Sequence, residues 1–165
     1  MLLEDTATIA GFFAAHAIWC VSDGETLQPM LGFAHADERR EMARLETETL
    51  EEGVRVGLQW LEENPQAVDQ AVLIYDGFIT LAGEENLDAL IIEARRYGEE
   101  PGGFTMAIPY RSASDPKGFA VFRPKFVDLE NAQAVVMDLS TAFFKGVNQH
   151  KEAAPVWKAH LVESA

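Results

Sequence analysis

The feature that most constrains this fold is a series of short apolar segments between Ala71 and Phe126, separated by residues that favour turns. Apolar runs of this length, bounded by Gly, Pro, Asn and Asp, are typical of β-strands joined by tight connections. Helical patterns stand before and after this block rather than alternating with it. Strands grouped in this way predict an α+β fold with a mostly antiparallel meander over residues 70–126, in a single domain of residues 1–165.

Several strands are predicted within the block. Asp76-Gly77 lies between the apolar runs 71–75 and 78–81, and an Asp-Gly pair in that position favours a hairpin. A long bent strand with a bulge at Gly77 is the alternative. A polar turn follows at residues 83–86. Further strands are predicted at residues 88–97, 104–111 and 119–126.

An N-terminal hairpin over residues 27–47 extends the predicted sheet. Residues 27–34 are apolar and are broken by Pro29, which favours an edge strand. Residues 41–47 fit either a strand paired with 27–34 or the start of a helix. We favour the strand, because Thr49 and Glu52 form a capping box that begins a new helical pattern directly afterwards.

Four helices are predicted to cover the sheet, near residues 6–21, 50–63 and 131–147, with a short C-terminal helix from about Pro155 to Val162. Asp5 and Thr6 are suitable N-cap residues for the first helix. Asn64-Pro65 ends the second helix, because proline does not continue a helix and restricts the residue before it.

The charge of the chain narrows the possible partners. Asp and Glu number 27 against 13 Lys and Arg, for a net charge of -14. Binding to a phosphate backbone requires many cations, so no nucleic-acid partner is expected. An acidic surface instead attracts basic proteins.

The N-terminal apolar stretch 7–20 is shorter than the ~20 residues that span a bilayer, so no membrane partner is expected. Acidic residues precede it, whereas a secretory signal begins with basic ones. Cys20 is the one cysteine and cannot form an internal disulfide. A cytoplasmic location is therefore predicted.

Residues 95–125 reverse the sign of the charge, with six basic and three acidic side chains. Because side chains alternate along a strand, Glu93, Arg95 and Tyr97 share one face. Arg111 and Arg123 join them if the neighbouring strands pair polar face on polar face, whereas a shift of one residue separates them. The cluster would bind a carboxylate or phosphate, with Glu93 or Tyr97 as a polar or acid–base group. The alternative is that these cations protect outward-facing strand positions against aggregation.

No motif names a reaction, and the catalytic residues stay unassigned. His16 and Cys20 share a helix face, but two ligands are too few for zinc, so neither a metal nor a cofactor is predicted. The most favoured function is a non-enzymatic binding protein that recognises a basic protein partner or itself. The apolar pair Trp157 and Leu161 suggests a homodimer contact. The alternative is a protein or enzyme that binds a small anionic ligand on the arginine-rich surface.

Overall fold

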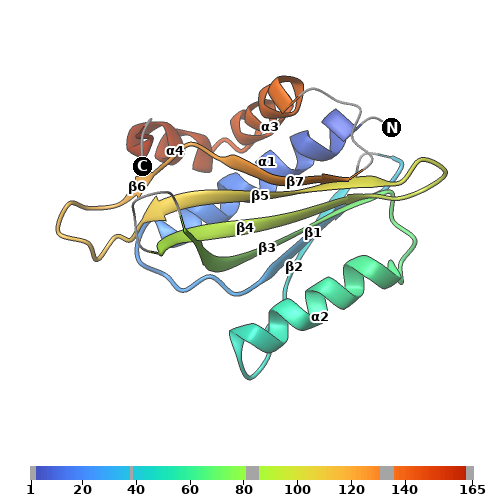
Figure 1. Cartoon of the computed structure of the whole chain (residues 1–165), viewed down its shortest axis with the longest axis horizontal. Helices are drawn as coiled ribbons and strands as arrows, with labels where there is room; N and C mark the ends of the chain where they lie inside the picture. Colours follow the sequence, from blue (N-terminus) through green and yellow to red (C-terminus); the bar gives the residue numbers. More distant parts are fainter. Residues whose placement is uncertain (1–2, 38, 81–85, 131–135, 163–165) are drawn as a thin grey trace.

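A seven-stranded antiparallel sheet forms the middle layer of the molecule, with helices on both of its faces, as in the α+β fold predicted (Figure 1). The computed structural model describes residues 3–37, 39–80, 86–130 and 136–162. The elements in chain order are α1 (Leu3–Val21), β1 (Met30–Ala34), β2 (Arg40–Arg44), α2 (Leu50–Glu63), β3 (Gln70–Ile79), β4 (Leu87–Arg96), β5 (Gly102–Arg111), β6 (Ala120–Val121), β7 (Lys125–Glu130), α3 (Val136–Gln149) and α4 (Ala153–His160).

The strands follow the order β2-β1-β3-β4-β5-β6, and β7 also pairs with β5. The N-terminal hairpin is confirmed, and the ambiguous segment 41–47 contributes the strand β2. The prediction that 27–34 forms an edge strand is wrong, because β1 lies between β2 and β3. Pro29 directly precedes β1, so its missing N–H removes no hydrogen bond from the strand interior.

The predicted hairpin at Asp76-Gly77 is wrong, and the alternative is correct in its single long strand but wrong in its bulge at Gly77. β3 runs through both residues and pairs in regular register with β4, with Gly77 opposite Ala89 and no bulge. A two-residue hairpin needs positive φ, which Gly77 does not have. The turn predicted at 83–86 lies mostly outside the described residues.

The predicted strand 119–126 is divided in two. Val121 of β6 pairs with Tyr110, and Lys125 of β7 pairs with Ala107. Val121 is buried with Tyr110 in the core beneath α1. Lys125 instead lies on the same face of the sheet as Ala107. That face is opposite to the face of Tyr110 and Val121, because side chains alternate along β5. The predicted common face for residues 119–125 is therefore wrong, and Arg123 lies exposed between the two strands.

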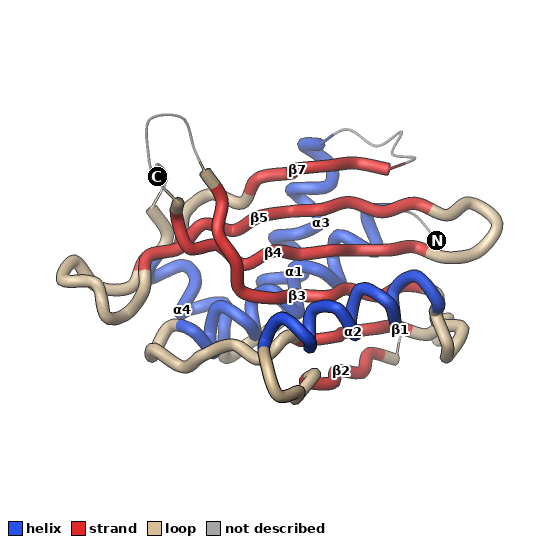
Figure 2. The backbone as a smooth tube through the Cα atoms, turned by 60° about the horizontal axis from the view of Figure 1, so that its bottom comes forward, coloured by secondary structure: helices blue, strands red, loops and turns tan. Residues whose placement is uncertain are grey.

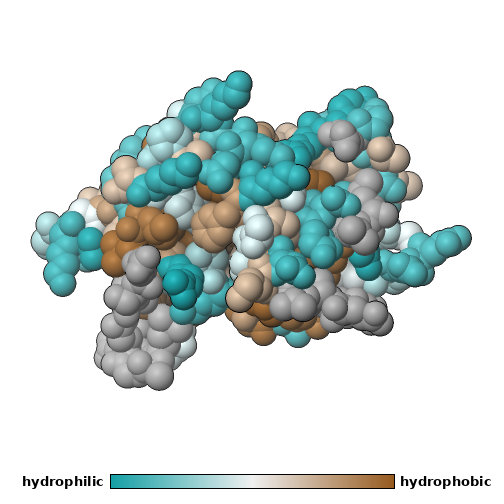
Figure 3. All heavy atoms as spheres, turned by 90° about the horizontal axis from the view of Figure 1, so that it is seen from above, coloured by the Kyte–Doolittle hydropathy of each residue, from teal (hydrophilic) through white to brown (hydrophobic). Residues whose placement is uncertain are grey.

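Helices α1, α3 and α4 cover one face of the sheet, and α2 lies on the other (Figures 1 and 2). The larger core lies under α1, where even-numbered positions of the strands are buried: Val72, Ile74, Leu90, Ile92, Phe104, Met106 and Ile108. Seen from the side of α3 and α4, hydrophilic side chains cover most of the surface, and apolar ones form smaller patches (Figure 3).

Two glycines bring α1 and α3 into backbone contact. A Cβ atom added to Gly146 would lie 1.8 Å from the carbonyl oxygen of Thr8. One added to Gly11 would lie 1.8 Å from the carbonyl oxygen of Phe143. The close approach of the two helices therefore requires glycine at both positions.

The first helix begins at Leu3 rather than at residue 6, so Asp5 and Thr6 are not its N-caps as predicted. Thr6 is fully buried, and its hydroxyl donates a 2.5 Å hydrogen bond to Gln70 Oε1 at the start of β3. Thr6, which the local sequence predicts as a helix cap, therefore bonds to Gln70 in the sheet instead.

Both ends of α2 agree with the sequence. Thr49 accepts a hydrogen bond from the Glu52 N–H, and Asn64 takes the left-handed conformation after the last turn. The third predicted helix is present as α3, while residues 131–135 lie outside the described ranges. The C-terminal helix is present as α4.

Candidate binding surface

Helix α2 covers only part of its face of the sheet. It packs mainly on β3, where a Cβ added to Gly57 would lie 2.5 Å from Leu73 Cδ1. Figure 2 shows β4, β5 and β7 extending beyond the helix, with no described helix in front of them. We call this region the open half-sheet and define it by the outward residues Glu93, Arg95, Thr105, Lys125 and Asp128.

Alternation along the strands explains why polar side chains gather there. Glu93 pairs with Thr105, and Thr105 pairs in turn with Asp128 of β7. The Thr105 hydroxyl donates a 2.5 Å hydrogen bond to Glu93 Oε1, and Arg95 Nη1 lies 3.7 Å from the same oxygen. The side chains of Glu93 and Arg95 are 16% and 31% exposed, so this pair is half-buried in the sheet surface.

Tyr97 follows directly after β4 and joins the sheet to α2. Its hydroxyl donates a 2.6 Å hydrogen bond to the carbonyl oxygen of Leu61, in the last turn of α2. Burial raises the pKa of Tyr97 to about 12, partly offset by the nearby charge of Arg95. A phenol that stays protonated and already donates to the backbone anchors the helix rather than serving as a base.

Of the residues in the predicted arginine cluster, the structure brings together Glu93 and Arg95 on β4 and Tyr97 directly after that strand. Arg111 lies eight residues farther along β5 than Gly103, the residue that pairs with Arg95. At ~3.3 Å per residue, that separation is about 26 Å.

Arg111 and Arg123 have other surroundings. Arg111 Nε donates a 2.8 Å hydrogen bond to the carbonyl oxygen of Gly118, and Nη2 donates to that of Lys117. These bonds close the loop between β5 and β6. Arg123 is exposed in the segment between β6 and β7.

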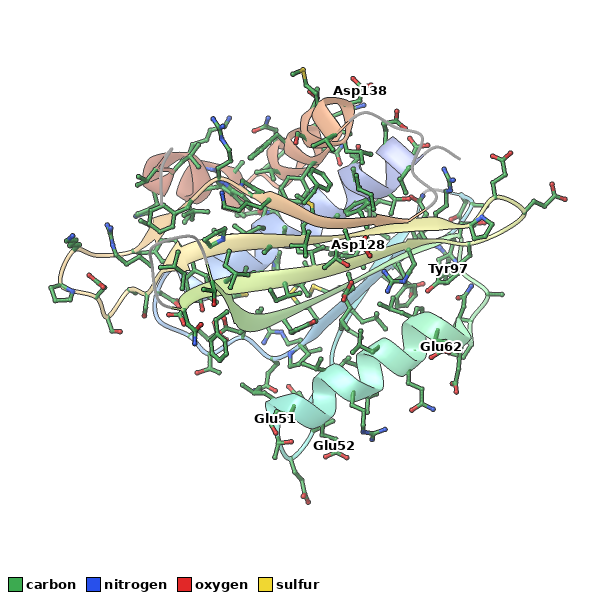
Figure 4. All side chains as sticks on the ribbon, viewed as in Figure 1. Glu51, Glu52, Glu62, Tyr97, Asp128 and Asp138 are labelled. Carbon is green, nitrogen blue, oxygen red and sulfur yellow. The ribbon has the colours of Figure 1, made fainter. Side chains whose placement is uncertain are left out.

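Acidic side chains border the open half-sheet. Glu51 and Glu62 are exposed on α2, and Asp128 is exposed on the sheet (Figure 4). At the end of the sheet near Tyr97, a further depression is lined by Asp69, Arg96, Tyr97, Glu99 and Glu100. From the sequence, the carboxylates of α2 are predicted only to lie on the solvent-exposed side of the helix, and not beside an open sheet surface. Asp128 was missed because the predicted strand ended at residue 126.

One flank of α2 faces the open half-sheet. The ring of Trp60 packs 5.3 Å from that of Phe33 in β1, so this side of the helix leans away from β4. Leu58 precedes Trp60 by two residues, or about 200° around the helix, and therefore lies on the side of β4. Leu58 is 39% exposed, which adds apolar area to the border.

Glu51 and Glu62 belong to the same flank as Leu58. Eleven residues separate them, or about three helical turns. Glu52 and Glu63 each follow by one residue, which turns them by about 100° to the other flank. The two flanks of α2 thus carry equal numbers of these carboxylates, but only one faces the open half-sheet.

His16 and Cys20 are placed on α1 as the sequence predicts, but His16 makes its contact with His150, which directly follows α3. Within the described ranges, no three His, Cys, Asp or Glu side chains gather in a way that could hold a metal ion. Nor does any helix in those ranges have the length and apolarity needed to cross a membrane.

Comparison with known proteins yields no match among protein-family models, curated proteins or solved structures.

Proposed function

We propose that this chain is a non-enzymatic binding protein that recognises a basic segment of a protein partner on the open half-sheet and the adjoining flank of α2. The observation that carries this proposal is that α2 covers only one half of its face of the sheet and borders the other half with Glu51, Leu58 and Glu62. A sheet face of this kind, unlike the face under α1, offers area to a partner.

The charges around this surface favour a basic occupant. The cations Arg95, Arg96 and Lys125 are outnumbered by carboxylates on α2, on β4, on β7 and at the end of the sheet: Glu51, Glu62, Glu93, Glu99, Glu100 and Asp128. Arg95 lies beside Glu93, so its charge is partly offset. Rim carboxylates accelerate the encounter with a basic protein and reject acidic ones.

The same geometry supports binding rather than acid–base chemistry. Tyr97 is occupied by the backbone of α2, and Glu93 is occupied by Thr105. A general base must lie within hydrogen-bond reach of the substrate proton that it removes. Tyr97 thus already donates its proton to Leu61, and Glu93 already accepts a hydrogen bond through Oε1, so both groups are engaged within the fold.

The experiment compares three forms of the full chain as bait: the wild type, Glu51→Lys/Glu62→Lys, and the matched control Glu52→Lys/Glu63→Lys. Both variants change the net charge equally, in the same turns of the same helix, but on opposite flanks. Bound proteins are identified at low salt, and the affinity of each purified partner is then measured against all three forms.

We expect at least one basic partner whose affinity falls about tenfold or more in Glu51→Lys/Glu62→Lys and much less in the control. Its binding should weaken as salt rises from about 50 mM to about 300 mM, because salt screens exposed charges. Equal loss in both variants would locate binding elsewhere and contradict the proposal. So would a set of partners that is acidic or indifferent to salt.

A further inference from the structure

A cavity of about 370 Å³ lies on the other side of the molecule, where α1 and α3 meet the starts of β2 and β3. Ala34 and Gln70, each 2% exposed, and Ile9, 5% exposed, form its deepest part. The polar groups around them include Asp5, His35, Arg40, Lys145 and Gln149. None of these residues belongs to the open half-sheet.

The contact between α1 and α3 builds two walls of this cavity. Gly146 packs against the backbone of Thr8, which holds the two helices together at this level. Lys145 and Gln149 are one turn apart on α3 and therefore share the face that borders the cavity. The helix packing thus places a cation and an amide opposite the first turns of α1.

Arg40 forms the third wall and is held in position. Its Nη1 donates a 2.8 Å hydrogen bond to Gln149 Oε1, and its guanidinium carbon lies 5.0 Å from the centre of the Phe12 ring. A guanidinium carries five N–H donors, so it can hold Gln149 and still contact a carboxylate. Stacking on an aromatic ring lowers the entropy cost of that contact.

Lys145 supplies a second positive charge. Within the part of the chain that the structure describes, its ammonium group makes no hydrogen bond or ion pair. Among the described residues that line the cavity, Arg40 and Lys145 are the cations beside His35 and Asp5 is the carboxylate, in a chain of net charge -14. His35 adds no anion site, because its Nε2 lies 2.6 Å from Glu41 Oε2.

We infer that this cavity binds a small molecule through one carboxylate group, held between Arg40 and Lys145. The volume lies near the lower end of the range for small-molecule sites, about 300–1,000 Å³, which suits a metabolite rather than a nucleotide. Asp5 repels a second negative charge, which favours a monoanion over a phosphate dianion. The buried amide of Gln70 provides polar contact at the floor.

The test uses three probes on the full chain: propionate, its neutral amide propionamide, and inorganic phosphate. Binding is followed by amide chemical shifts, with the ionic strength held constant. We expect saturable shifts around the cavity for propionate, an affinity at least about tenfold weaker for phosphate, and no saturation for propionamide.

Two variants and two controls locate the site. Lys145→Gln and Arg40→Gln should each weaken propionate binding about tenfold, the loss expected when a charge-assisted contact disappears. The neighbours Arg39→Gln and Lys151→Gln remove equal charge from exposed positions outside the cavity and should leave it unchanged. Lys145 is exposed, so its replacement does not threaten folding.

The inference is overturned if propionate does not saturate, or if Lys145→Gln and Arg40→Gln bind it as the wild type does. Tighter binding of phosphate than of propionate would overturn the choice of a carboxylate. Equal losses in the two controls would show general charge attraction instead of a site. None of these results depends on the partner surface beside α2.

Discussion

The imidazole rings of His16 and His150 meet with 3.1 Å between Nδ1 of His16 and Nε2 of His150, although 134 residues separate them in the chain. His150 Nδ1 accepts a 3.1 Å hydrogen bond from the Ala153 N–H, so a neutral His150 carries its proton on Nε2. His150 then donates to His16 Nδ1, which leaves the His16 proton on Nε2. That nitrogen is buried and has no partner among the described residues.

This arrangement should make stability depend on pH. Burial lowers the pKa of His16 below 6.5, and the neighbouring His150 and Arg44 lower it further, while Glu152 and Glu25 act in the opposite direction. Above pH 6.5 the ring is neutral in both the folded and the unfolded chain. Below that pH the unfolded chain takes up the proton first, so stability falls until the folded form also titrates.

We therefore expect the melting temperature to fall as the pH decreases from about 6.5 towards 5, and His16→Gln to flatten that decrease. His160→Gln is the control, since His160 lies on α4, bonded to the carbonyl oxygen of Val156 and away from the pair. A thermal-melt series over pH measures all three proteins. An unchanged slope in His16→Gln would show that other groups cause the dependence.

Gly146→Ala should destabilise the chain strongly. The new methyl group would lie 1.8 Å from the Thr8 carbonyl oxygen, which belongs to a helix backbone and cannot rotate away. The helices would have to separate, at a cost of about 3 kcal/mol or more in the free energy of unfolding. Chemical denaturation measures this change.

Gly77→Ala is the control for that substitution. Its added methyl group would lie 3.2 Å from Ile91 Cγ1, a side-chain atom that can shift, and its φ is not positive. We expect a change below about 1 kcal/mol. Similar losses in both variants would mean that the backbone contact between α1 and α3 is not the cause.

Local signals in the sequence predict the elements whose ends are set by their own neighbours. Thr49 and Asn64 were expected to bound α2, and both do so through bonds within a few residues. The apolar residues within each strand also predict the sheet and the core beneath α1. The pattern within a single strand shows which of its faces is buried, whichever strands pair with it.

Signals that depend on a distant partner mislead or are lost. Asp76-Gly77 resembles a turn, but the Asp76 carboxylate accepts a 2.7 Å hydrogen bond from the Tyr110 hydroxyl, 34 residues away. The distance between Arg95 and Arg111 depends on pairing register, which alternation does not fix. Trp157, expected at a dimer contact, is 1% exposed and packs against Phe143 and Phe144.

Tyr110→Phe tests the contact that replaces the expected turn. Burial raises the pKa of Asp76, and the hydrogen bond from Tyr110 lowers it again in part. Removing the hydroxyl should therefore raise the pKa of Asp76 further, and should cost about 1 kcal/mol of stability because Asp76 remains partly in contact with water. Carboxyl NMR titration measures the first effect. A pKa that stays constant or falls would show that the bond does not favour the ionised carboxylate.

Thr6→Val should reveal how α1 is tied to the sheet at the floor of the cavity. The variant keeps the shape of the side chain but removes the donor to Gln70 Oε1, and both residues are at most 2% exposed. A buried acceptor that loses its donor costs about 1–3 kcal/mol, which denaturation would measure. Thr141→Val makes the same change at an exposed helix position and should alter stability by less than about 0.5 kcal/mol.

The double variant Thr6→Val/Gln70→Leu separates the loss of this bond from the cost of a buried acceptor that has lost its Thr6 donor. Replacing both partners by apolar side chains removes the buried acceptor as well as its donor, so the double variant should be more stable than the sum of the two single effects predicts. Simple additivity would mean that Thr6 and Gln70 contribute independently. The bond would then not be what holds the first turns of α1 against β3.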